Sequence, residues 1–202
     1  MQKLICFIKE YRWRSSFFLV HTLLYRCRFI VWWYRRIKIT LLCQGNIGRG
    51  TVIEKDIYVT PRSRIKIGQR VFLGRRSILE FSKSSAGLII GDDTWISHDF
   101  HAEFANTLTI GKKVLIGEFV SVRESTHSYA DAKRHVKDQK DVYGHLEIQD
   151  GVWIGRGSLI IGSPSGITIG KDSIIAANST VSCSIPSNTI WGGAPARFIK
   201  GR

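Results

Sequence analysis

Residues 110–122 read IGKKVLIGEFVSV, and the aliphatic residues Ile110, Ile116 and Val122 in this stretch stand six positions apart. The same spacing recurs in blocks on both sides of the stretch. Of 18 such positions, 17 are Ile, Leu or Val, and the other is Ala102. The remaining positions are Ile47, Ile53, Val59, Ile67, Leu73, Leu79, Ile90, Ile96, Ile148, Ile154, Ile160, Ile169, Ile175 and Val181.

A period of six fits neither an amphipathic helix nor a two-sided strand, so it indicates a structural repeat. Each hexad supplies a short strand with an inward aliphatic residue, followed by a corner where Gly or another small residue lets the backbone bend. Three hexads make one turn, and stacked turns bury a continuous apolar column. The blocks therefore predict an all-β parallel β-helix with a triangular section and about six turns, over residues 47–186.

One interruption of the repeat is long, at residues 128–147. The shorter ones, such as 85–89 and 166–168, are small enough to be corner insertions. A long excursion from a regular solenoid is usually functional, which favours a binding or catalytic loop. A surface loop without a role is the alternative.

The net charge of +14 is spread unevenly over the 202 residues. Residues 1–42 hold nine Lys or Arg and one acidic residue, a net +8, whereas the rest of the chain holds 21 and 15, a net +6. We therefore divide the chain into a basic aromatic N-terminal segment, 1–44, and a β-helix domain, 45–202. A basic arm favours an anionic partner, either a membrane surface or nucleic acid.

Aromatic and basic side chains are mixed along the arm, which is typical of an amphipathic helix at a membrane interface. Its longest charge-free stretch has 11 residues, fewer than the roughly 20 of a spanning helix. The alternative is a helical cap on the open end of the solenoid. Nucleic-acid binding is not expected, because no known reader motif is present. The arm predicts peripheral contact through residues 1–42, at the inner face of the cytoplasmic membrane.

The four cysteines have no metal-ligand spacing, which indicates free thiols in a reducing, cytoplasmic compartment. They are Cys6, Cys27, Cys43 and Cys183.

His127 is the strongest candidate for chemistry. It closes the third hexad of the fourth turn, directly before the long interruption. A neutral imidazole at a rigid corner beside a loop is suited to act as a general base near neutral pH. The alternative is a surface histidine on a loop edge.

His98 and His101 flank Asp99, a pattern that occurs in metal sites. On a solenoid, however, successive side chains point in different directions. We therefore expect no metal here, and we expect Ser97, His98 and Asp99 to form a polar wall on the acceptor side of the site.

The C-terminal sequence departs from the repeat after Ile185-Pro186. Arg197 and Lys200 stand three apart, so a short helix would place both cations on one face, where they could grip phosphates. A solubilising basic tail is the alternative.

These residues resemble the hexapeptide-repeat acyltransferases, and most closely the galactoside, maltose and surface-polysaccharide O-acetyltransferase branch. The resemblance covers about residues 45–200. It rests on four pieces in order: Thr126-His127-Ser128-Tyr129, Gly151-Val152-Trp153-Ile154-Gly155, Ile175-Ala176-Ala177-Asn178-Ser179-Thr180-Val181, and residues 188–200.

The resemblance implies a left-handed coil and a homotrimer with active sites between neighbouring prisms, and acetyl-CoA along the later turns. The family's catalytic histidine falls on His127. Its cofactor-contacting positions fall on Trp153, Arg156, Ala177, Ser182, Arg197 and Lys200. The sequence departs from the family at Ser97, where relatives carry Asn, and at residues 161–166, where its corner is longer.

Together these observations predict acetyl transfer from acetyl-CoA to a sugar hydroxyl, with His127 as general base. The expected acceptor is a lipid-linked or surface-polysaccharide glycan. The runner-up is an N-acyltransferase acting on an amino sugar or another small amine. A β-helical metal-dependent hydratase would require His98, His101 and His127 to converge between subunits. A non-catalytic β-helix scaffold is the remaining alternative.

Overall fold

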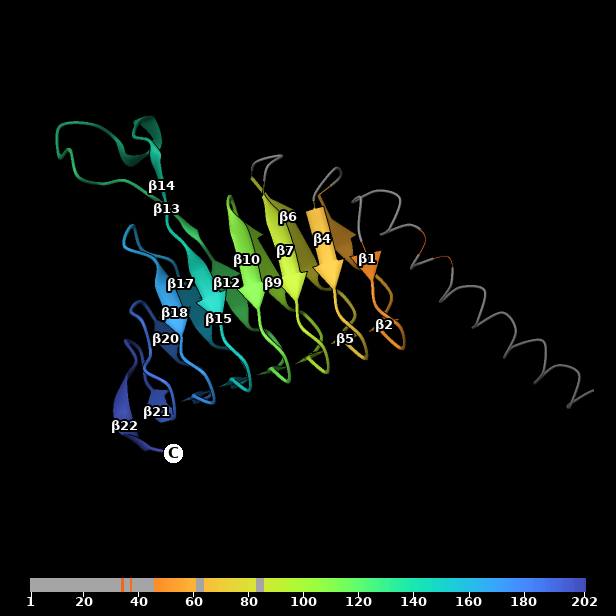
Figure 1. Cartoon of the computed structure of the whole chain (residues 1–202). Helices are drawn as coiled ribbons and strands as arrows, with labels where there is room; N and C mark the ends of the chain where they lie inside the picture. The colour runs from red at the N-terminus through yellow and green to blue at the C-terminus, as the bar shows by residue number, and fades with distance from the viewer. Residues whose placement is uncertain (1–33, 35–36, 38–45, 61–63, 83–85) are drawn as a thin grey trace, which may run out of the picture.

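A computed structural model describes Tyr34, Ile37 and residues 46–60, 64–82 and 86–202. The N-terminal segment expected to be amphipathic therefore lies, apart from those two residues, outside the described part of the chain. The described chain winds into a solenoid of six turns, and its turns stack along one axis (Figure 1).

Each turn gives one short strand to each of three parallel sheets. The first sheet consists of β1 (Asn46–Ile47), β4 (Arg64–Ile67), β7 (Gly87–Ile90), β10 (Thr107–Ile110), β15 (Leu146–Ile148) and β18 (Ile167–Ile169). The second consists of β2 (Val52–Ile53), β5 (Phe72–Leu73), β8 (Trp95–Ile96), β11 (Leu115–Ile116), β16 (Trp153–Ile154), β19 (Ile174–Ile175), β21 (Thr189–Gly192) and β22 (Arg197–Gly201). The third consists of β3 (Tyr58–Val59), β6 (Ile78–Phe81), β9 (His101–Phe104), β12 (Ser121–Arg123), β17 (Leu159–Ile161) and β20 (Thr180–Val181).

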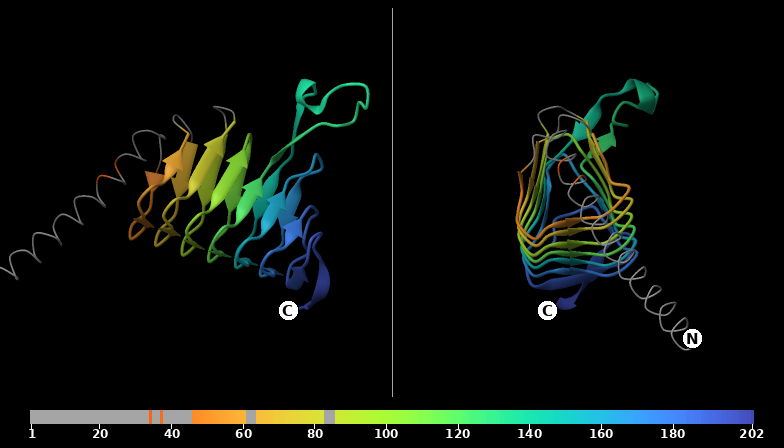
Figure 2. Two further views of the ribbon diagram at one scale, coloured as in Figure 1. Left: turned by 180° about the vertical axis from the view of Figure 1, so that it is seen from behind. Right: turned by 90° about the vertical axis from the view of Figure 1, so that its right-hand side faces the viewer.

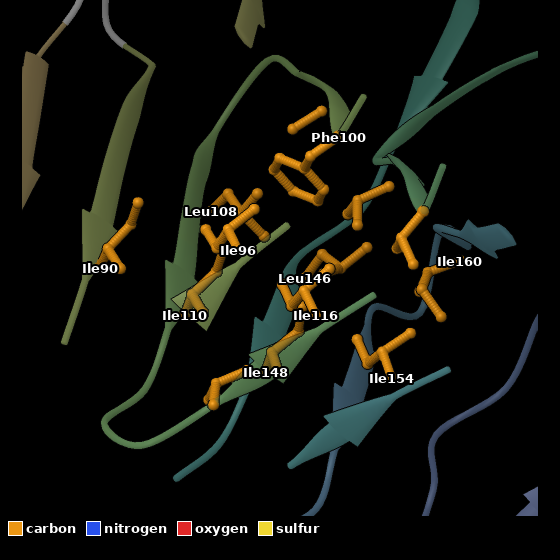
Figure 3. Close-up of a cluster of buried hydrophobic side chains, with 14 of the residues drawn as sticks. Ile90, Ile96, Phe100, Leu108, Ile110, Ile116, Leu146, Ile148, Ile154 and Ile160 are labelled. Carbon is orange, nitrogen blue, oxygen red and sulfur yellow. The ribbon is translucent and has the colours of Figure 1, made fainter. Parts of the chain in front are cut away.

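The hexad residues pair with one another from turn to turn, which confirms the predicted repeat. In the first sheet, Ile90 pairs with Ile110, and Ile110 pairs with Ile148. The hexad positions are buried, except Ile47 and Val59 in the first described turn, which are partly buried. Figure 3 shows the resulting column of apolar side chains inside the prism. Burying each Ile, Leu or Val contributes about 1.5–3 kcal/mol, so the column is the main stabilising feature.

Three corners join the sheets in every turn. We call the corner between the first and second sheets the first corner, that between the second and third sheets the second corner, and that leading back to the first sheet the third corner. At the second corner of the fourth turn, a Cβ on Gly117 would lie 2.7 Å from the backbone nitrogen of Arg156 in the next turn. Turns stack this closely only where the corner residue has no side chain.

The predicted excursion leaves the third corner of the fourth turn. β13 (Ser125–His127) and β14 (Asp141–Tyr143) pair as an antiparallel ribbon, with the short 3-10 helix η1 (Val136–Asp138) between them. The chain rejoins the first sheet at β15. Figure 2 shows this ribbon and its loop standing out from the prism.

The C-terminal segment is a strand, so the expected helix is wrong. β22 pairs antiparallel with β21, with a register shift between Ile190 and Trp191, and it extends the second sheet. Its backbone hydrogen bonds are satisfied by the neighbouring strand, which leaves no reason for the chain to coil. The spacing of Arg197 and Lys200 therefore does not place them on one helical face.

Among the described residues, no helix is long and apolar enough to cross a membrane. Cys183 carries a free, exposed thiol, as expected, while the other three cysteines lie outside the described residues.

Candidate functional site

His127 stands opposite Asp141 in the ribbon that begins the excursion. Its Nδ1 lies 2.7 Å from Asp141 Oδ1. Because an ionised carboxylate only accepts hydrogen bonds, Nδ1 of the neutral ring must carry the proton, which leaves the lone pair on Nε2. The His127 side chain is 73% exposed, so a substrate has access to it. The arrangement is that of a general base whose tautomer is fixed by an acidic partner.

Asp141 is held on its second oxygen as well. The Tyr143 hydroxyl donates to Asp141 Oδ2 at 3.3 Å. Burial raises the pKa of Tyr143, and the nearby charge of Asp141 raises it further, so the phenol stays protonated as a donor near neutral pH. Asp141 is thereby oriented by one neighbour and orients another.

A cavity of about 520 Å³ opens beside His127, between the ribbon and the third sheet. Glu103 of β9 and Arg123 of β12 form one part of its wall, and they are joined by an ion pair of 2.5 Å. Leu159 and Ile161 of β17 supply an apolar strip. A base, an ion pair and an apolar strip around one hollow are the usual elements of a small-molecule site.

The base of the excursion is fixed by a buried carboxylate, Glu124, which is only 2% exposed. It accepts hydrogen bonds from the backbone N–H groups of Ala105 and Asn106, at 2.7 and 2.8 Å, and from the Asn106 side chain. Asn106 also donates to the carbonyl of Gly144, where the excursion returns. Both ends of the loop are therefore tied to one corner, which limits how far His127 can move.

The predicted cofactor residues lie away from this cavity. Trp153, on β16, faces outward from the second sheet and is 48% exposed. Arg156 occupies the second corner of the fifth turn and Ala177 that of the sixth turn, and Ser182 follows β20. Arg197 and Lys200 are exposed on β22. These positions form a row along the later turns, on the second sheet, the second corner and the C-terminal strand, with Ser182 just past the third sheet.

Ser97, His98 and Asp99 lie at the second corner of the third turn, in line with that row. Arg76 pairs with Asp99 through two hydrogen bonds of 2.7 and 2.6 Å, and His98 Nδ1 lies 2.7 Å from the same carboxylate. The hydrogen bond from Arg76, with a further contribution from His98, lowers the pKa of Asp99 to about 2. Within one chain, these residues do not line the cavity of His127.

At the second corner, Phe119 lies between His98 and Arg156 and contacts both. Its ring meets His98 edge-on at 5.8 Å, and the Arg156 guanidinium lies 5.6 Å from its centre. Phe119 is half exposed, and its φ of 58° lies in the left-handed region. Bulky residues rarely adopt that conformation, which makes this corner a locally strained point of the solenoid.

The histidines considered as metal ligands each contact a different carboxylate. His98 pairs with Asp99, His101 with Glu80, and His127 with Asp141. In the part of the chain that is described, no three His, Cys, Asp or Glu side chains gather as a metal site.

Sequence reasoning missed the partners of His127. Asp141 follows it by 14 residues, and only the strand pairing across the excursion brings the two together. Glu103 and Arg123 belong to different turns and meet because neighbouring strands are in register. The repeat period could have indicated the second pair, because outward residues about one turn apart in sequence are neighbours in a solenoid.

Comparison with known proteins gives matches across the solenoid. A family model described as the hexapeptide repeat of succinyl-transferase matches residues 64–97 and 146–183. Galactoside O-acetyltransferase of Escherichia coli is 32% identical over 157 residues, which cover 77% of this chain and 63% of that protein. The chain spans between 42% and 63% of the length of the first three curated relatives that it matches.

Solved structures share the fold. A hexapeptide-repeat-containing acetyltransferase of Vibrio cholerae, complexed with acetyl coenzyme A, is 25% identical with a TM-score of 0.59, over 83% of this chain and 76% of that one. In a second structure of that protein, the match is 32% identical over 64% of this chain and 72% of the other, with a TM-score of 0.51. An N-acyltransferase from Bacillus cereus has a TM-score of 0.68 over 83% of this chain and 89% of its own, at 19% identity, which shows the fold alone.

Proposed function

The chain belongs to the hexapeptide-repeat acetyltransferase family, and from this premise we propose that it moves an acetyl group from acetyl-CoA to a sugar hydroxyl. The observation that carries the proposal is the His127–Asp141 pair at the mouth of a cavity. The Vibrio cholerae relative that binds acetyl coenzyme A supports the choice of donor, and the Escherichia coli galactoside enzyme supports the choice of acceptor.

In the proposed reaction, Nε2 of His127 takes the proton from the acceptor hydroxyl as its oxygen attacks the thioester carbonyl. The tetrahedral intermediate then collapses, the carbon–sulfur bond breaks, and the CoA thiolate recovers the proton from the imidazolium. An ester and free CoA are the products. Asp141 stabilises the positive charge that forms on the ring. Holding both substrates side by side removes the need for a covalent acyl-enzyme.

Acetyl-CoA is a substrate in this scheme, and the row from Trp153 to Lys200 suits its chemistry. Arg156, Arg197 and Lys200 are exposed cations that can pair with phosphates, and Trp153 offers an aromatic face. We propose that the donor lies along this row, with Ala177 at its edge. Ser182, which follows β20 into the third corner, would contact the donor held by a neighbouring copy. Ser97, His98 and Asp99 continue the row toward the reacting end.

We further propose a homotrimer, because His127 and the donor row lie on different sides of one prism. The third corner, which carries His127, faces away from the second sheet, as Figure 1 shows for β13 and the second-sheet strand β21. A neighbouring copy that presents its second sheet to this corner would complete the site. The left-handed coil implied by the resemblance is part of the same proposal.

The acceptor we favour is a glycan at the membrane, which the basic arm would approach. Nearly all of the arm lies outside the described residues. Its proposed contact with the membrane is tested by deleting it. Removing residues 1–42 should release the protein from membrane fractions. Unchanged fractionation would count against an interfacial role and favour the cap.

The reaction is tested with radiolabelled acetyl-CoA and fractionated cell-envelope glycans. We expect label in a glycan fraction, and we expect hydroxylamine at alkaline pH to release it, because esters are cleaved and amides are not. Label that resists this treatment would identify an N-acyltransferase. Absence of label from every fraction would overturn the proposed function.

A further inference from the structure

Two charged residues of the cavity have no part in the proposed proton transfer. Glu103 and Arg123 point outward from β9 and β12, where neighbouring strands place them side by side. The ion pair of 2.5 Å fixes both side chains, although they stay partly exposed, at 26% for Glu103 and 44% for Arg123. They are therefore ordered and still accessible to a molecule in the cavity.

The pair presents both kinds of hydrogen-bonding group to the hollow. A guanidinium has five N–H donors, and the contact with Glu103 uses one of them. The carboxylate has a second oxygen that can accept. Vicinal hydroxyls of a sugar donate and accept at a similar spacing, so a diol matches this pair better than an apolar molecule does.

An apolar strip lies beside the pair. Ile161 follows Arg123 in register on β17, and Leu159 precedes it by two positions on the same face. Sugar rings have a hydrophobic face of C–H groups that needs such a surface. The cavity thus offers polar groups to the edge of a ring and an apolar floor to its face.

The charge of the cavity selects among sugars. Glu103 and Asp141 carry two negative charges, and Arg123 carries one positive charge. An acidic sugar would bring a further carboxylate close to two others, in a half-buried setting where repulsion is only partly screened. The balance favours a neutral ring.

We propose that Glu103 and Arg123 form the acceptor subsite, which recognises vicinal hydroxyls of a neutral hexopyranose that lies on Leu159 and Ile161. The proposal rests on the proposed function and adds the substrate class. It gives acceptor recognition to the wall beside His127, in place of the expected wall of Ser97, His98 and Asp99, which do not line this cavity within one chain.

The test measures binding, so that it does not depend on catalysis. Methyl hexopyranosides, and methyl glucuronide as the acidic member, are titrated into the full-length protein and followed by saturation-transfer NMR. Glu103→Gln and Arg123→Met should weaken binding of the neutral glycosides by about 10-fold or more, the usual effect of losing a charged hydrogen bond. Methyl glucuronide should bind at least about 10-fold more weakly than its neutral counterpart.

Asp93→Asn and Arg70→Met are the matched controls, because Arg70 and Asp93 form a similar ion pair between turns at the first corner. The controls should bind glycosides as the wild type does. If the Glu103 and Arg123 variants bound neutral glycosides as tightly as the wild type, the proposal would be overturned. A wild type that binds no neutral glycoside would overturn it as well. Glycosides that bind normally but receive no acetyl group would instead contradict the proposed function.

Discussion

At the scale of single residues, the contact with Asp141 fixes the tautomer of His127. The hydrogen bond of 2.7 Å between them keeps the proton on Nδ1 and directs the basic nitrogen outward. An amide at this position could donate to Nδ1 and thereby favour the other tautomer. In the proposed reaction, Asp141 thus positions His127 and stabilises its charged form.

Asp141→Asn should therefore lower kcat between about 10-fold and 10⁴-fold, with little change in the KM for acetyl-CoA. Steady-state kinetics over a range of pH is the measurement. Asp131→Asn, in the same loop, is the control. A variant that keeps the wild-type kcat at every pH would remove Asp141 from the mechanism.

Asp99 gives the chain a pH-dependent contact. Its pKa falls from 3.8 to about 2 in the folded protein, chiefly through the hydrogen bond from Arg76. A carboxyl whose pKa is lower in the folded than in the unfolded protein stabilises the fold at every pH above its unfolded-state pKa. This contribution is lost as the pH falls through the pKa of the folded state. Asp99→Asn should melt below the wild type at about pH 6, and the difference should vanish toward pH 2. A difference that is independent of pH would contradict the ion pair.

At the scale of elements, the corners limit what the repeat tolerates. Gly117 faces the backbone of Arg156 in the next turn at a distance that no Cβ can occupy. Gly117→Ala should destabilise the protein by about 1–3 kcal/mol or more, because the turns must separate.

Gly201→Ala is the control for that substitution, since an added Cβ there would meet nothing within 4 Å. Both variants are compared by urea unfolding. If they unfolded at the same denaturant concentration, the close stacking at the second corner would be refuted.

The elements that follow the repeat were predictable from the sequence, and those that depend on pairing across the chain were not. Ile110, Ile116 and Val122 point inward because a strand and a corner recur every six residues. The excursion was located by the break in the same pattern. The strand β22 was mistaken for a helix because a spacing of three between two cations does not record the neighbouring strand that satisfies its backbone.

The candidate site shows the same division. His127 could be found because its place is fixed by the ladder. Asp141 and Glu124 could not, because their roles arise only when the loop closes and one carboxylate becomes buried. In sequence, Glu124 looks like any charged residue at the end of a strand.

At the scale of the whole molecule, the second sheet carries an exposed apolar row. Val52, Trp95, Leu115 and Trp153 occupy equivalent outward positions in different turns, and Phe72 stacks on Trp95 with ring centres 4.0 Å apart. Such a row along one face of a prism suits contact with a second copy. It also lies on the side that the proposed trimer must cover.

We expect a native mass of about 69 kDa, three times the chain mass of 22.9 kDa. Trp95→Lys should shift the protein to monomers, because it introduces a charge into the apolar row. Ile89→Lys, which changes a similarly exposed apolar residue on the first sheet, should leave the mass unchanged. Light scattering that gives one mass for all three proteins would argue against this face as the interface.

In the proposed reaction, His127 is the base that drives acetyl transfer. The most direct test is the turnover of His127→Ala with acetyl-CoA and the acceptor fraction that the wild type labels, beside His135→Ala as a loop control. We predict a loss of about 10²–10⁴-fold for His127→Ala alone, with melting temperature and native mass unchanged. Wild-type turnover by a folded His127→Ala protein would contradict the account.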